Sequence, residues 1–181
     1  MNPKNYDIYP LSDIMGRLDE NVIRGLLSSF RSVYDSATES FLREKALDMG
    51  KRDLSRTHLA ISKVNRNVIG YITLSIKCMV VPKENLLSGK TLKGMNIESS
   101  TGVAQSYLLG QLSRSKDAPK GLGGEMLDLA FDKLGQAKGI VGCRMVRLDC
   151  HDELIPYYTD HGFRLITKNG SGSLNQMMAF V

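Results

Sequence analysis

The sequence has 181 residues, of which 42% are hydrophobic and 24% are charged, and its formal net charge at pH 7 is +5. This composition excludes an intrinsically disordered chain, and the length fits one domain that can bury a full hydrophobic core. No apolar run approaches the roughly 20 residues that a membrane-spanning helix needs, and the first residues lack the apolar segment of a secretory signal. We therefore expect a cytoplasmic protein that does not enter the membrane.

Two helices are predicted near the start of the chain. Apolar residues recur at helical spacing over 14–30, with Ser12 placed to cap the helix. A second helix is expected to begin at Ser36, where Glu39 completes a capping box, and to end at Gly50.

Strand character follows these helices. The stretches 58–62 and 68–74 surround the polar turn 65–67, which predicts an antiparallel hairpin. The polar stretch 82–100 is rich in Lys, Gly and Ser, so we expect a long, variable surface connection there. Another strand is predicted over 106–112.

The rest of the chain alternates between helix and strand. A helix over 122–138, a strand over 145–148 and a short helix over 152–160 precede two strands at 163–166 and 174–180. Close hairpins at both ends predict an α/β (α+β) fold with a mixed sheet, because hairpins join antiparallel strands. No repeat or composition break is found, so residues 1–181 are predicted to form a single domain.

The segment 116–127 carries glycines at the junction between a strand and a helix. Such glycines let the backbone approach a ligand, while the first amides of the helix remain unpaired and favour phosphate. Lys116 and Lys120 would add positive charge. A Walker loop is excluded because Glu125 follows the last glycine, and a dinucleotide fingerprint is excluded by Met126. The alternative is a flexible loop with a glycine cap.

A second motif follows one helix and one strand later. Tyr158, followed four residues on by Gly162 and Phe163, resembles the signature of the GNAT N-acetyltransferase superfamily. Gly121 and Gly123 likewise resemble that family's pyrophosphate loop. The resemblance covers roughly residues 36–181 and implies a mostly antiparallel central sheet flanked by helices.

The resemblance is incomplete at two positions. Ala118 stands where the family loop has Arg or Gln, and His151 stands where an asparagine is frequent. Within the superfamily, the stretches 41–46, 54–59 and 69–75 look like the bacterial toxin-type branch. Its members acetylate aminoacyl-tRNA and are neutralised by a small antitoxin.

The resemblance implies an N-acetyltransferase that moves an acetyl group from acetyl-CoA to a primary amine. Its cofactor-binding residues would be Leu112, Ser113 and Arg114 on the central strand, and Lys120, Gly121, Leu122, Gly123, Gly124 and Glu125 in the loop. Tyr158 would donate a proton to the departing coenzyme A thiolate, with Tyr157 as the second choice. Alternatively, Tyr158 simply packs beside Phe163.

Other roles stay open at this point. His151, His161 and Asp149 are polar groups near the expected site, but no general base is assigned. No metal is expected, because the three cysteines lack paired metal-site spacing, and Cys143 and Cys150 are expected to be reduced core residues. The basic residues Lys51 and Arg56, among others, could guide tRNA or belong to a solvated surface.

Three functions remain in competition. The first is an acetyltransferase for a small-molecule or macromolecular amine. The second is a toxin that acts on aminoacyl-tRNA and has an antitoxin partner, and the third is a non-catalytic module that binds coenzyme A or a protein. A homodimer would be compatible with each of them.

Overall fold

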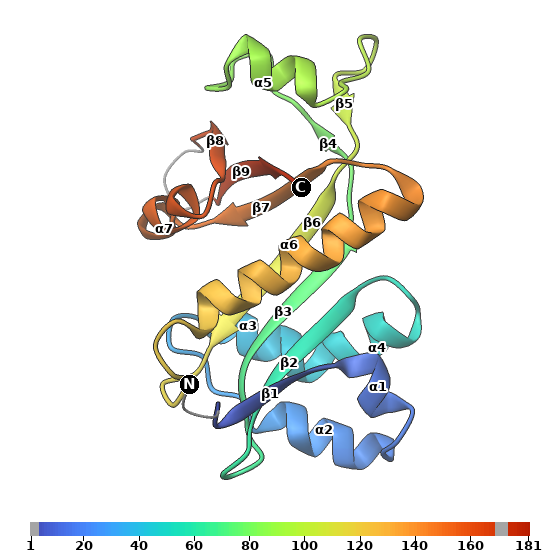
Figure 1. Ribbon diagram of the computed structural model, residues 1–181, viewed down its shortest axis with the longest axis vertical. Helices are drawn as coiled ribbons and strands as arrows, with labels where there is room; N and C mark the ends of the chain where they lie inside the picture. The colour runs from blue at the N-terminus through green and yellow to red at the C-terminus, as the bar shows by residue number, and fades with distance from the viewer. Residues whose placement is uncertain (1–3, 169–173) are drawn as a thin grey trace. The chain divides into compact units, whose positions relative to one another are not determined.

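The computed structural model describes residues 4–168 and 174–181 (Figure 1). The chain folds as two compact units. Unit 1 comprises residues 1–75 and 111–128, and unit 2 comprises residues 76–110 and 129–181. Among the described residues, no helix combines the length and apolar character required to span a membrane.

Backbone hydrogen bonds place seven strands in the order β1-β2-β3-β6-β7-β9-β8. Their bounds are β1 Tyr6–Pro10, β2 Arg56–Ser62, β3 Val68–Ile76, β6 Tyr107–Arg114, β7 Met145–Cys150, β8 Arg164–Thr167 and β9 Asn175–Phe180. The pairs β1–β2, β2–β3, β7–β9 and β8–β9 are antiparallel, whereas β6 and β7 are parallel. The predicted fold class, a mixed and mostly antiparallel sheet flanked by helices, is therefore confirmed.

The hairpin predicted in unit 1 is formed by β2 and β3. Its turn places Arg66 at a φ of +61°, and the Asn65 side chain accepts a hydrogen bond from the Asn67 amide. Asn and Asp side chains bind nearby backbone in this way, which is why the polar turn could be recognised.

The expected helix over 14–30 is two helices, α1 (Leu11–Met15) and α2 (Glu20–Ser28). The amide of Gly16 closes α1 by donating to the Ser12 carbonyl, and the chain turns before Asp19, which occupies the N-cap position of α2 without a side-chain capping hydrogen bond. The helical spacing of apolar residues continues across this turn because both helices bury an apolar face in the same hydrophobic core. The prediction of one continuous helix was therefore wrong.

The next helical segment starts at Ser36, as predicted, but with a different cap. Asp35 accepts the hydrogen bond from the Ala37 amide, and Glu39 binds the amide of Ser32 at 2.7 Å. The prediction of a capping box between Ser36 and Glu39 is therefore wrong. Asp35, one position earlier, caps the helix instead, and aspartate is as good an N-cap residue as serine.

This segment comprises three consecutive helical elements, which are α3 (Ser36–Ser40), the π-helical turn η1 (Phe41–Lys45) and α4 (Ala46–Lys51). Together with α1 and α2 they cover one face of β2 and β3 (Figure 1). The buried core between them includes Leu27, Phe30, Leu42, Leu47, Leu59 and Tyr71.

Strand β1 has no counterpart among the predicted elements. It pairs with β2 from Tyr6 opposite Ser62 to Pro10 opposite His58. Five residues that end in proline carry little periodicity, and proline is compatible with the end of an edge strand. This segment forms a strand because it pairs with β2, which lies about 50 residues away in the chain.

In unit 2, the expected long connection over 82–100 contains regular structure. The ribbon of β4 (Met79–Val80) and β5 (Val103–Ala104) brackets helix α5 (Gly89–Gly94), whose first turn is capped by Ser88. These elements pack on a methionine-rich core made by Met79, Met95, Met145 and Met178 with Val81, Ala104 and Ile166. The sequence did not predict these short elements, because sparse apolar residues here reach a core that the local pattern does not reveal.

Two further helices complete the fold. Helix α6 (Leu122–Val141) begins in unit 1 and continues into unit 2. In unit 2 a short 3-10 turn, η2 (Asp152–Leu154), leads into α7 (Ile155–Asp160). The predicted helices over 122–138 and 152–160 are thus confirmed within a few residues.

Candidate functional site

In unit 1 the glycine loop turns directly into α6. Gly121 has a φ of +93°, a conformation that favours glycine, and its carbonyl accepts the first helical hydrogen bond from Glu125. The amide of Leu122 donates to Pro119. The amides of Lys120, Gly121, Gly123 and Gly124 have no hydrogen-bond acceptor among the described residues. These four N–H groups, at the positive end of a 20-residue helix, can bind a diphosphate.

The loop's acidic residue has partners of its own. Glu125 accepts hydrogen bonds from the Tyr6 hydroxyl at 2.5 Å and from the Lys4 ammonium at 2.7 Å. Lys4 therefore offsets the negative charge that Glu125 places near the free amides. Because the Glu125 amide is also bonded to Gly121, this residue binds the loop to β1 rather than offering an N–H group to a ligand.

Close approach between β3 and α6 depends on Gly70. A Cβ atom at this position would lie 2.9 Å from Cδ2 of Leu122 and 3.3 Å from Sδ of Met126. Leu122 and Met126 are fully buried, so neither has room to move aside. The first turn of α6 is thus seated directly on β3, which fixes the direction of the free amides. The sequence contains Gly70 in a predicted strand, which signals close backbone approach but not the partner.

The predicted cofactor strand β6 presents its peptide groups alternately to two edges. The Ser115 amide bonds to Ile69 of β3, so Ser113 also faces β3. Leu112 and Arg114 consequently present their main chain to the opposite edge. There the Arg114 carbonyl accepts a hydrogen bond from Val33 at 3.1 Å. The main chain of Leu112 and the Arg114 amide are the groups that this edge can offer to a pantetheine arm.

The side chain of Ser113 belongs to a hydroxyl cluster in unit 1. Its Oγ lies 3.0 Å from Oγ of Ser32 and accepts from Oγ1 of Thr38 at 3.1 Å. The carbonyl of Thr38 in turn accepts from the Tyr71 hydroxyl at 2.7 Å. This network holds the segment before α3 against the end of β6.

In unit 2 the predicted acid, Tyr158, lies in α7 with its ring buried. The ring contacts the edges of two neighbours, Phe163 at 5.6 Å and Tyr157 at 5.3 Å between centroids. Its hydroxyl donates to no acceptor within the described part of the chain. The structure thus shows both packing beside Phe163 and a hydroxyl that is free to donate.

The Gly-Phe motif is the C-terminal cap of α7. The amide of Phe163 donates to the Tyr158 carbonyl and that of Gly162 donates to the Thr159 carbonyl, both at 3.0 Å. Gly162 has a φ of +87°. These are the two hydrogen bonds of a Schellman motif, which also brings the residue after the glycine against the residue five positions earlier. The spacing recognised in the sequence is therefore the spacing that this cap requires.

Burial raises the pKa of Tyr158 above its ordinary value of 10.0, and the nearby Cys150 and Tyr157 raise it further. The phenol is therefore protonated at neutral pH, as a proton donor must be, but the raised pKa also makes it a weaker acid than an ordinary tyrosine. Burial, followed by the charge of Asp149, likewise raises the pKa of Cys150 to about 11. A thiol that stays protonated is a poor nucleophile, in agreement with its predicted structural role.

The three candidates for a general base differ in their surroundings. Nδ1 of His161 lies 2.8 Å from the Tyr157 carbonyl, at the end of α7. Both oxygens of Asp149 accept from the buried Arg147 at 2.8 Å. His151 is exposed and precedes η2. Two of the three are therefore engaged, and no base is assigned.

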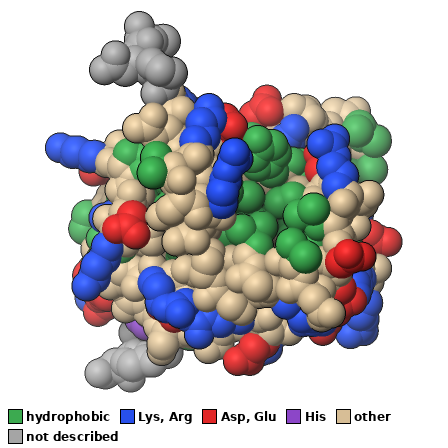
Figure 2. All heavy atoms as spheres, turned by 90° about the horizontal axis from the view of Figure 1, so that it is seen from below, with side chains coloured by type: hydrophobic (Ala, Val, Ile, Leu, Met, Phe, Trp, Pro, Cys, Tyr) green, Lys and Arg blue, Asp and Glu red, His purple; other side chains and the backbone are tan. Residues whose placement is uncertain are grey.

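Positive charge is dispersed rather than concentrated on the face shown in Figure 2, where Lys and Arg side chains alternate with acidic ones around a hydrophobic centre. Two of the basic residues considered for tRNA have acidic partners, because Lys51 pairs with Glu20 and Arg56 with Asp53. Lys116 and Lys120 are exposed beside the loop and pair with no carboxylate in the described ranges. The described residues contain no group of three or more His, Cys, Asp or Glu side chains that could hold a metal ion.

Among the comparisons with known proteins, only the comparison with solved structures finds matches. No protein-family model matches the sequence, and no curated protein matches it either. Solved structures do share its fold. A tyrosine-to-phenylalanine mutant of KacT is 19% identical, with a TM-score of 0.76 over 98% of this chain and 95% of that one. AtaT complexed with acetyl-methionyl-tRNAfMet is 19% identical, with a TM-score of 0.72 over 94% and 93%.

A third structure, a mutant AtaT toxin bound to the C-terminus of the antitoxin AtaR and acetyl-CoA, is 18% identical, with a TM-score of 0.70 over 98% of this chain and 94% of that one. At these identities the likeness concerns the fold. The chain therefore shares the fold of these solved structures.

Proposed function

We propose that this protein is an acetyl-CoA-dependent N-acetyltransferase that transfers the acetyl group to a primary amine by direct attack in a ternary complex. The observation that carries the proposal is the set of free amides at Lys120, Gly121, Gly123 and Gly124. A loop that leaves four N–H groups without acceptors at the start of a long helix is suited to the diphosphate of coenzyme A.

The pantetheine arm would add to the edge of β6 at Leu112 and Arg114, as an extended chain adds to a sheet. Ser113 would contribute indirectly, because its hydroxyl cluster fixes this end of the strand. Together with the free amides, these contacts would hold the thioester still while the amine approaches. Such positioning is a proximity effect.

The chemistry needs one proton donor. The neutral amine attacks the thioester carbonyl carbon, a C–N bond forms, and the carbonyl electrons move to the oxygen. When the tetrahedral intermediate collapses, the C–S bond breaks and the sulfur leaves with the electron pair. The Tyr158 hydroxyl would protonate this thiolate, while the amine proton passes to water or to a base that is not assigned.

Calorimetry with coenzyme A tests the loop directly. Replacing Gly123 by proline removes one of the free N–H groups at a position in the first helical turn, where proline is tolerated. Gly123→Ala keeps the N–H group and is the matched control. A hydrogen bond to a charged group is worth about 1.5–3 kcal/mol, so the proline variant should bind coenzyme A at least about ten-fold more weakly. Equal affinity of both variants and the unmodified protein would contradict the proposed loop.

The acceptor is tested by mass spectrometry after incubation with acetyl-CoA and candidate amines, including aminoacyl-tRNA. Likeness in fold to AtaT solved with acetyl-methionyl-tRNAfMet favours aminoacyl-tRNA as the specific candidate, and likeness to AtaT bound to AtaR favours a small antitoxin partner. Acetylated aminoacyl-tRNA and growth arrest on expression would support this toxin-type activity. Coenzyme A binding without acetylation of any amine would instead indicate a non-catalytic module.

A further inference from the structure

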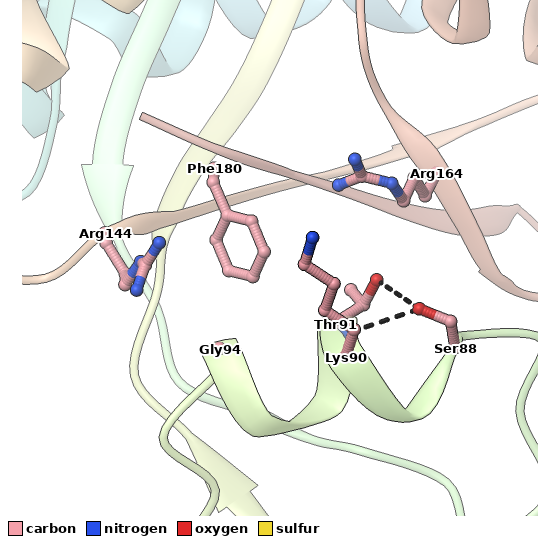
Figure 3. Close-up of a pocket in the computed structure, with 7 residues that line it drawn as sticks. All are labelled: Ser88, Lys90, Thr91, Gly94, Arg144, Arg164 and Phe180. Carbon is pink, nitrogen blue, oxygen red and sulfur yellow. Dashed lines mark hydrogen bonds between the residues drawn. The ribbon is translucent and has the colours of Figure 1, made fainter.

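A separate cavity of about 450 Å³ lies in unit 2, between α5 and the strands β8 and β9. Figure 3 shows Lys90 of α5 and Arg164 of β8 directed toward this space, whereas Arg144, which precedes β7, lies beyond the ring of Phe180. The cavity is completed by Ser88, Thr91 and Gly94. Three cationic side chains therefore belong to the lining of one cavity, with Lys90 and Arg164 on one side of the Phe180 ring, and the lining contains no acidic residue.

These cations have no carboxylate partners. Among residues 4–168 and 174–181, none of Lys90, Arg144 and Arg164 forms an ion pair, although Arg147 in the same unit pairs with Asp149. Like charges placed around one cavity repel one another unless an anion lies between them. The cavity therefore has the electrostatics of an anion site.

Part of the cavity wall is fixed before any ligand binds, whereas Lys90 and Arg164 are exposed. A Cβ atom at Gly94 would lie 2.8 Å from Cζ of Phe180, so the ring rests directly on the helix backbone. The guanidinium of Arg144 lies 4.7 Å from the centre of the same ring, in a cation-π contact. The hydroxyls of Ser88 and Thr91 lie 2.9 Å apart and cap α5 (Figure 3).

A second cavity of about 450 Å³ shares Ser88, Thr91 and Arg164 with the first and supplies an apolar surface beside it. Its apolar lining consists of Leu86, Leu87, Phe163 and Leu165. The two cavities thus adjoin at these three residues, and together they are called the groove, with a cationic end and an apolar end. A ligand that carries a phosphate on one side and a flat or apolar group on the other fits this division.

An acidic peptide fits the groove less well. A peptide would bind most firmly by adding to the edge of β8, but at Ile166 this edge is already occupied by the amide of Leu86 at 2.8 Å. The planar guanidinium group of Arg164, beside the ammonium of Lys90, is by contrast well suited to the oxygens of a phosphate. The groove therefore favours a phosphate ester.

We propose that this groove is a binding site for a nucleoside phosphate, with the phosphate between Lys90 and Arg164 and the nucleoside toward Leu86 and Phe163. The phosphate would come either from a free nucleotide or from one nucleotide of a nucleic-acid strand. This site is distinct in its residues from the glycine loop proposed for coenzyme A, and its occupation does not require acetyl transfer.

Titration of the full chain with adenosine monophosphate and with a short oligoribonucleotide, followed by calorimetry, tests the site. The variants Lys90→Gln and Arg164→Gln should each weaken binding by about ten-fold, because each removes a charge-assisted contact. Lys93→Gln is the matched control, since Lys93 is an exposed lysine of the same helix outside the cavity lining. It should leave the affinity unchanged.

Two control ligands are uncharged adenosine, which lacks the phosphate, and a glutamate-rich peptide, which represents the alternative acidic ligand. Adenosine should bind at least ten-fold more weakly than its monophosphate. Similar affinity of the monophosphate and the oligonucleotide would identify a free nucleotide, and binding of the oligonucleotide alone would identify a nucleic acid. The proposal is overturned if the pocket variants bind both probes as tightly as the unmodified protein, if Lys93→Gln loses as much affinity, or if the peptide alone binds.

Gly123→Pro separates this proposal from the acetyltransferase. It should weaken coenzyme A binding at the loop by at least about ten-fold and leave binding of the monophosphate intact, whereas Arg164→Gln should weaken binding of the monophosphate by about ten-fold and leave coenzyme A binding intact. If the loop does not bind coenzyme A, the affinities of Lys90→Gln and Arg164→Gln for adenosine monophosphate still test whether the groove binds a phosphate.

Discussion

The ring of Phe163 lies edge-on against the ring of Tyr158, with 5.6 Å between their centroids, and the Phe163 amide donates to the Tyr158 carbonyl at 3.0 Å. One residue therefore holds both the backbone and the side chain of the proposed acid. Gly162 makes this arrangement accessible because its φ of +87° reverses the chain between them. The motif that resembles an acetyltransferase signature is, physically, a helix cap that fixes a phenol.

Replacement of Tyr158 by phenylalanine should lower turnover by about 100-fold or more, because general acid catalysis typically contributes that much. Binding of coenzyme A should be retained, since the ring and its packing on Phe163 remain. Release of thiol from acetyl-CoA and calorimetry measure the two quantities. Tyr157→Phe is the control and should keep most of the activity. If Tyr158→Phe turns over at the original rate, the tyrosine does not serve as the acid.

Replacement of Gly162 by alanine should destabilise the protein by about 1–2 kcal/mol, because an L-residue is strained in the left-handed region. A Cβ atom at Gly162 would meet nothing within 4 Å, so the cost should be conformational rather than steric. Gly135→Ala is the matched control. A Cβ at Gly135, inside α6, also meets nothing within 4 Å, and this change should stabilise by about 0.5–1 kcal/mol. Urea denaturation gives both free energies of unfolding, and the same sign for both variants would be inconsistent with this explanation.

Replacement of Gly70 by alanine should destabilise unit 1 by about 1–3 kcal/mol, the usual cost of overpacking a core. The added methyl would press on Leu122, displace the first turn of α6 and thereby weaken coenzyme A binding. Gly25→Ala, in α2, is the control because a Cβ there meets nothing within 4 Å. Denaturation and calorimetry measure the two effects. Unchanged coenzyme A affinity in Gly70→Ala would show that the loop does not depend on this contact.

Alkaline titration should reveal the pairing of Tyr6 with Glu125. Burial, then the hydrogen bond and charge of Glu125, raise the pKa of Tyr6 from 10.0 to about 12. Because the folded pKa lies above the unfolded one, the neutral phenol stabilises the fold below about pH 10, and this contribution is lost as the pH rises toward 12. Phenolate absorbance, compared between the protein and Tyr6→Phe, measures this ionisation.

Glu125→Gln is the companion variant for this titration. It should lower the pKa of Tyr6 while leaving it above 10, because burial is the largest cause and remains. At low pH the stability contributed by this pair changes with pH in the opposite direction. The hydrogen bonds from Lys4 and Tyr6 lower the pKa of Glu125, so its contribution to stability is present above the unfolded pKa and is lost as the pH falls through the folded one. A pKa of Tyr6 that is identical in the protein and in Glu125→Gln would rule out the proposed coupling.

Local chemistry determined much of this protein from the sequence by itself. The turn before Val68, the glycine at the start of α6 and the cap after α7 each require particular residues within a few positions, so their residues could be recognised without a structure. The fold class followed from the order of these elements, because short connections leave few topologies.

Only the tertiary structure decided the features that depend on distant partners. Strand β1 exists because β2 pairs with it, and Gly70 matters because Leu122 packs where its side chain would be. The free amides were predicted as a group, but hydrogen bonds to Pro119 and Gly121 decide which of them remain free. Likewise, nothing local to Lys90 indicates that Arg144 and Arg164, more than 50 residues away, share its cavity. A chain specifies its turns through neighbouring residues, whereas contacts between segments exist only after the whole chain has folded.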